Sequence, residues 1–68
     1  MYNNLDMGIM SSVTCGKNIV TIDTGLDDVG RVIYQVSWFN GRKWKYVRYR
    51  RFNEARATYR MILEMITI

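Results

Sequence analysis

The sequence predicts an α+β fold: an antiparallel meander of three strands, or four, followed by one C-terminal amphipathic helix packed on one sheet face. Two segments, 31–39 and 43–52, are rich in β-branched and aromatic residues and flank Asn40-Gly41. This arrangement is the strongest short-range signal for a β-hairpin. Beyond residue 52 the apolar residues change to helical spacing. A helix crossing one face of a meander is the simplest way to bury both apolar stripes.

The length and composition indicate a single small domain over residues 1–68, of which 49% are hydrophobic. A chain this short buries only about 60% of its unfolded surface, so it needs a dense aromatic core or a second subunit. Cys15 is the only cysteine and there is no histidine. An internal disulfide is therefore excluded, and a structural zinc site is nearly excluded.

In the N-terminal half we expect a strand over residues 18–24, bounded by Cys15-Gly16-Lys17 before it and by a turn over residues 25–30 after it. Residues 8–14 are a candidate for an additional short strand that pairs through the turn at Gly16. Residues 1–7 are a candidate flexible arm.

Small and acidic residues in two turns have a structural explanation. Asp27-Asp28 lies between Gly25 and Gly30, where turn chemistry accounts for both carboxylates. Cys15 lies next to a turn glycine and has no base partner, so we expect a passive thiol there rather than a nucleophile.

The C-terminal half is expected to contain two strands, over residues 31–39 and 43–52, and a helix over residues 54–66. Asn53 is a suitable N-cap for this helix. Its apolar stripe repeats at helical intervals and should face the core. The stripe consists of Ala55, Tyr59, Ile62, Leu63 and Ile66. Arg56, Arg60 and Glu64 lie on the solvent-exposed side of the helix.

The length of the connection at Asn40-Gly41 decides which side chains share a sheet face. A connection of two or four residues places Val32, Tyr34, Val36, Val47 and Tyr49 under the helix. The opposite face then carries Ile33, Phe39, Trp44, Tyr46, Arg48 and Arg50. A three-residue loop with a bulge at Gly41 would shift the pairing by one and mix the two sets. We favour the first register because it segregates the charges.

Positive charge is concentrated in residues 31–60, which carry a net charge of +8, whereas residues 1–30 carry −3 and residues 61–68 carry −1. Cations screen phosphate charge, and the interleaved aromatic rings offer surfaces for bases, so we expect a DNA- or RNA-binding protein that uses the 31–51 hairpin. Phosphate contacts are expected from Arg42, Lys43, Lys45, Arg48, Arg50 and Arg51, and stacking from Trp44 and Tyr46. Arg56 and Arg60 on the helix would extend this surface.

The same residues argue against other classes of protein. Six scattered carboxylates without a histidine or a phosphate-binding loop indicate no enzyme, no metal site and no cofactor. There is no apolar run long enough for a membrane span and no signal-peptide pattern at the start, which favours the cytoplasm, or a host cytoplasm for a phage protein.

Two alternatives remain open for the partner. A small basic chain of this type is also typical of inhibitors encoded by phages or mobile elements, including counter-defence proteins. Such an inhibitor would dock on an acidic or nucleic-acid-binding surface of a host protein. In addition, Met61, Met65 and Ile68 flank the helical stripe and could form a homodimer interface.

One further pattern runs through residues 30–57 and consists of Tyr34, Val36, Gly41-Arg42-Lys43, Phe52 and Glu54-Ala55. With these positions the segment resembles the arm-type DNA-binding domain of phage and transposon tyrosine recombinases, a three-stranded sheet with a helix that shares its architecture with plant AP2 domains. The resemblance implies that the sheet face, and not the helix, lies in a DNA groove.

Overall fold

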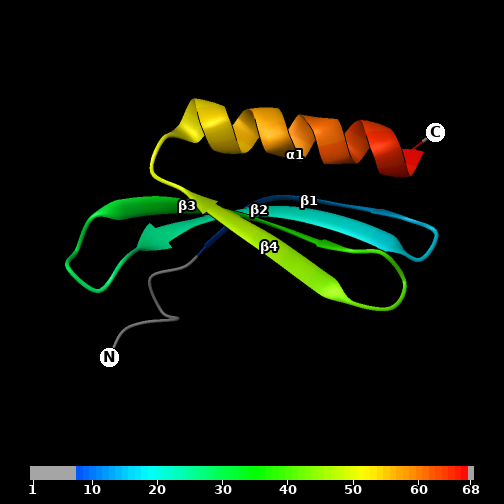
Figure 1. The fold of residues 1–68 in the computed structure, drawn as a ribbon, viewed down its shortest axis with the longest axis horizontal. Coiled ribbons are helices and arrows are strands. Elements are labelled where there is room, and N and C mark those ends of the chain that lie inside the picture. Colours follow the sequence, from blue (N-terminus) through cyan, green and yellow to red (C-terminus); the bar gives the residue numbers. More distant parts are fainter. Residues whose placement is uncertain (1–7, 68) are drawn as a thin grey trace.

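A computed structural model describes residues 8–67 as one four-stranded sheet and one helix (Figure 1). The elements are β1 (Gly8–Cys15), β2 (Asn18–Leu26), β3 (Val32–Phe39), β4 (Trp44–Tyr49) and α1 (Phe52–Thr67). All neighbouring strands are antiparallel, in the order β1-β2-β3-β4. The predicted α+β meander with a C-terminal helix is confirmed, and the optional first strand is present. The arm expected over residues 1–7 lies outside the described residues, as does Ile68.

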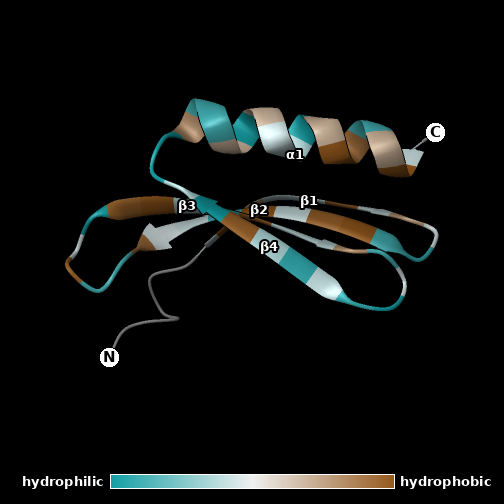
Figure 2. Cartoon of the chain, viewed as in Figure 1, coloured by the Kyte–Doolittle hydropathy of each residue, from teal (hydrophilic) through white to brown (hydrophobic). Residues whose placement is uncertain are grey.

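The core lies between α1 and one face of the sheet. Val20 on β2 and Val36 on β3 are fully buried, and Ala55, Tyr59 and Ile62 meet them from the helix. Because side chains alternate along a strand and recur every three to four residues along a helix, each element presents one apolar stripe to this core. Figure 2 shows hydrophobic residues along β2 and β3 and mostly hydrophilic residues in the turns between β1 and β2 and between β3 and β4. The predicted helical stripe is confirmed.

The connection between β3 and β4 has four residues, since Phe39 pairs with Trp44. The Asn40 side chain accepts hydrogen bonds from the backbone N–H groups of Arg42 and Lys43, at 3.0 and 3.1 Å. Gly41 has a φ of 93°, which a residue with a Cβ atom rarely adopts.

This four-residue connection produces the register that segregates the two faces. Tyr34 pairs with Tyr49 and Val36 with Val47, all on the side of α1. The alternate pairs, Gln35 with Arg48, Ser37 with Tyr46 and Phe39 with Trp44, point to the opposite face, which the one helix of residues 8–67 does not cover (Figure 1). We call it the open face.

Two strands end two or more residues away from the predicted position. β2 extends through Gly25 to Leu26, rather than ending at residue 24, because both residues pair with β3. The turn is therefore confined to residues 27–31. β4 ends at Tyr49, three residues earlier than expected, because α1 begins soon after it.

The predicted start of the helix was wrong. α1 begins at Phe52, so Asn53 lies in its first turn and is not the N-cap. The Ala55 N–H donates to the carbonyl of Arg51 at 3.2 Å. The Phe52 ring packs edge-on against the Tyr34 ring, with the two ring centroids 5.5 Å apart. This aromatic contact holds the first helical turn against the sheet. The capping preference of Asn53 is a local signal and did not predict it.

Candidate nucleic-acid interface

Two aromatic rings on β4 are exposed on the open face. Trp44 and Tyr46 alternate along the strand and are 56% and 61% exposed. The Phe39 ring of β3 supports Trp44, with centroids 5.3 Å apart and planes inclined by 36°. Two rings are thus fixed on one face with much of their surface accessible to a ligand.

Arg48 lies next to these rings and is held in place. Its guanidinium carbon is 5.4 Å from the centroid of the Tyr46 ring, a cation–π contact. Arg48 Nε donates to Gln35 Oε1 at 2.8 Å, and Gln35 Nε2 donates to Ser37 Oγ at 3.1 Å. These bonds orient the guanidinium without neutralising it, because both partners are uncharged.

The tip of the β3–β4 hairpin brings together cations from two turns. Arg42 and Lys43 are exposed there, and Lys45 joins them around one open hollow. A Cβ atom on Gly41 would lie 3.6 Å from the Cβ of Lys17. The β1–β2 turn therefore adds Lys17 to this end of the sheet. Sequence reasoning missed this cation because it depends on the order of the strands.

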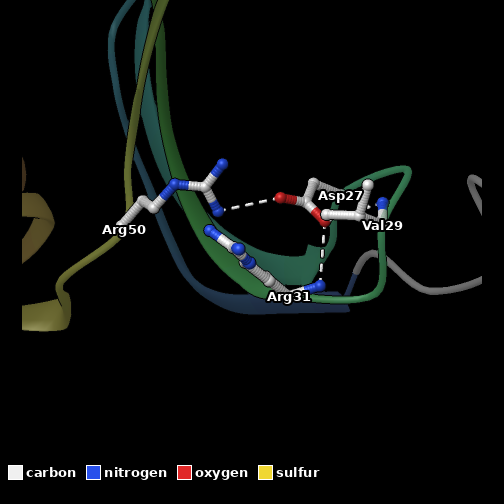
Figure 3. A network of polar contacts seen from close by, with 4 residues as sticks. All are labelled: Asp27, Val29, Arg31 and Arg50. Atoms are coloured by element: carbon white, nitrogen blue, oxygen red, sulfur yellow. Dashed lines mark hydrogen bonds and ion pairs between the residues drawn. The ribbon is translucent and has the colours of Figure 1, made fainter.

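Arg50 is bound to the turn between β2 and β3. Its guanidinium donates to Asp27 Oδ2 at 2.8 Å, in the only ion pair within residues 8–67 (Figure 3). Asp27 Oδ1 accepts from the backbone N–H groups of Val29 and Arg31 at 3.0 and 2.8 Å. The bond from Arg31, followed by that from Arg50, lowers the pKa of Asp27 from 3.8 to about 2. The predicted turn role of Asp27 is confirmed.

The remaining predicted contact residues lie elsewhere. Arg56 and Arg60 of α1 line a hollow together with Met10 and Ser11 of β1, on the helix side of the sheet. Lys45 also lines the groove between α1 and β4. Arg51 is exposed in the connection between β4 and α1. The structure therefore brings Trp44, Tyr46 and Arg48 together and places the helical cations on a different surface.

One carboxylate also belongs to the open face. Asp23 lies in register with Gln35, which pairs with Arg48. Asp23 Oδ1 is buried without a hydrogen-bond partner, and burial raises the pKa of this carboxyl group. Its negative charge disfavours an anionic group above β2, whereas the exposed cations lie on β4 and at the hairpin tip.

No metal-ligand cluster and no membrane-spanning helix is found within residues 8–67. They contain no group of three His, Cys, Asp or Glu side chains that could hold a metal ion. Their one helix is too short or too polar to cross a membrane. The chemistry available at the open face consists of stacking, hydrogen bonding and attraction of anions.

Comparisons with protein-family models, with curated proteins and with solved structures found no match to this chain. The resemblance of residues 30–57 to the arm-type domain of tyrosine recombinases therefore stays a prediction.

Proposed function

We propose that this protein binds nucleic acid through the open face of β3 and β4 and the adjoining hairpin tip. The observation that supports this proposal most is that cations without acidic partners lie beside exposed aromatic rings. Among residues 8–67 the single ion pair uses Arg50, which leaves Arg42, Lys43 and Arg48 available to phosphates. Arg is suited to this contact because its guanidinium binds phosphate in a bidentate manner and stacks on bases.

The position of β4 at the sheet edge also supports the proposal. An edge strand presents unpaired N–H and C=O groups that invite pairing with another chain. Lys43, Lys45, Arg48 and Arg50 lie on or next to β4, so a second copy added there would bring like charges together. A polyanion meets no such repulsion.

The test is a fluorescence-anisotropy titration of labelled oligonucleotides against the protein at several salt concentrations. Three phosphate contacts, from Arg42, Lys43 and Arg48, predict a slope of log K against log salt of roughly −2 to −3. Arg42→Glu/Lys43→Glu should weaken binding at least about tenfold and flatten the slope by roughly 1.5, because two contacts are lost.

A matched control is available on the helix. Arg56→Glu/Arg60→Glu makes the same change in net charge, from +4 to 0, on the opposite side of the sheet. This variant should lose far less affinity than the hairpin variant. Equal losses would refute the assignment of the surface. Absence of binding by the unaltered protein at low salt would refute the function, and the inhibitor alternative would then be the one to pursue by nuclease-treated pull-down.

A further inference from the structure

Building on the proposed function, we infer that the ligand is a single strand whose bases stack on Trp44 and Tyr46. These side chains are two residues apart on one strand, so their rings are spaced by roughly 6.6 Å. Bases within a duplex strand are spaced by about 3.4 Å and already stack on each other, so their faces are not accessible. A single strand can spread its bases and place one on each ring.

The two rings differ in how much of their surface a base can reach. Phe39 is paired with Trp44 across the strands, whereas the small Ser37 is paired with Tyr46. The Phe39 ring covers part of Trp44 at 5.3 Å, which fixes the orientation of the indole. Tyr46 has a serine as its cross-strand neighbour and carries the Arg48 guanidinium 5.4 Å from its centroid, and it is still the more exposed of the two, at 61%. Both rings are therefore oriented by the sheet while open toward solvent.

Charge determines where the sugar-phosphate backbone lies. Asp23 occupies the same row of the open face as Gln35 and Arg48, so phosphates are repelled from β2 and attracted to β4. Arg48, held by Gln35 at 2.8 Å, is placed to contact a phosphate next to the base on Tyr46. The strand then follows β4 toward Arg42 and Lys43 at the tip. The six residues of β4 span about 20 Å, enough for roughly three nucleotides at the spacing of the rings.

The experiment compares labelled dT12 and U12 with a 12-base-pair duplex at one low salt concentration. We expect both single strands to bind more tightly than the duplex. Trp44→Ala and Tyr46→Ala should each weaken single-strand binding by roughly 5- to 150-fold, the equivalent of about 1–3 kcal/mol per stacked base. Duplex binding should change less than about twofold. Trp44→Phe, which keeps an aromatic ring, should recover much of the loss.

Tryptophan fluorescence provides a direct readout of stacking. Trp38 lies on the helix side of the sheet, so Trp38→Phe leaves Trp44 as the only tryptophan, and its emission should be quenched by dT12 and by U12. If Trp44→Ala does not fold, Tyr46→Ala carries the same test, because no other ring is paired with Tyr46 across the strands. Tighter binding of U12 than of dT12 would support a contact with the ribose hydroxyl in addition to stacking, and equal binding would support stacking and phosphate contact alone.

Two results separate this inference from the function on which it rests. The first result is a duplex that binds as tightly as the single strands, with alanine variants that lose affinity for both ligands equally or for neither. This result would refute stacking and leave nucleic-acid binding in place. If no oligonucleotide binds, the proposed function itself fails.

Discussion

Truncation of Ile62 tests whether α1 covers one sheet face and so leaves the other open. Ile62 is only 4% exposed and belongs to the core with Val20 and Val36. Ile62→Ala removes three carbon atoms from this core, worth about 0.8 kcal/mol each by transfer alone. With the cavity that remains, the expected loss is about 2–5 kcal/mol.

This loss is large for a protein of 68 residues, whose whole free energy of unfolding is expected to be roughly 3–10 kcal/mol. Urea unfolding followed by circular dichroism is the appropriate assay. With a slope of about 1 kcal/mol per M for so small a chain, the midpoint should fall by at least about 2 M. The variant is therefore expected to be partly unfolded without denaturant if the parent stability is near the lower limit.

Met61→Ala is the matched control, since Met61 precedes Ile62 on α1 and is 56% exposed. It should change the free energy of unfolding by no more than about 0.5 kcal/mol. Similar midpoints for the Ile62 variant and the unaltered protein, or equal losses for the two variants, would show that α1 does not bury this stripe. The open face, and the proposed interface with it, would then have no basis.

Three further predictions concern single contacts. Because the pKa of Asp27 is lowered from 3.8 to about 2, its stabilising effect is complete above about pH 4 and is lost as the pH falls toward 2; Asp27→Asn should flatten melting temperature against pH in this range. Tyr59 Oη lies 2.9 Å from Ser11 Oγ, so a double-mutant cycle of Tyr59→Phe and Ser11→Ala should give a coupling of about 0.5–1.5 kcal/mol, and additive losses would argue against this bond. If Met61 and Met65, the latter 68% exposed, form the expected homodimer interface, Met65→Lys should halve the mass measured by light scattering, and a monomeric parent would contradict that interface.

Local sequence patterns correctly predicted the strands, the hairpin turn and the helix, because these elements depend on interactions between residues close in the sequence. The hairpin at Asn40-Gly41 and the helical stripe of Tyr59 and Ile62 follow from turn chemistry and side-chain periodicity, which act over a few residues. Alternation along β4 also placed Trp44 and Tyr46 on one face once the length of the connection was chosen. These are the parts of the candidate site that sequence reasoning reached.

The other parts required contacts between distant segments. Arg50 is 23 residues from Asp27, its partner, and nothing in either local sequence distinguishes this arginine from Arg48. Lys17 reaches the hairpin tip only because β1–β2 and β3–β4 turns lie at the same end of the meander. Strand order therefore determines which of several equivalent cations remain available, and composition alone cannot separate them.

The placement of charge favours a ligand that follows β4 rather than one that crosses the sheet. Among the strand residues within 8–67, Asp23 of β2 is the one carboxylate on the open face, and burial raises its pKa. Its negative charge repels phosphate from β2. Arg48 and the tip cations attract phosphate along the outer strand, where Trp44 and Tyr46 are exposed. Asp23→Asn removes the repulsion but not the attraction, so it should tighten single-strand binding; weaker binding would contradict the repulsion of phosphate by Asp23.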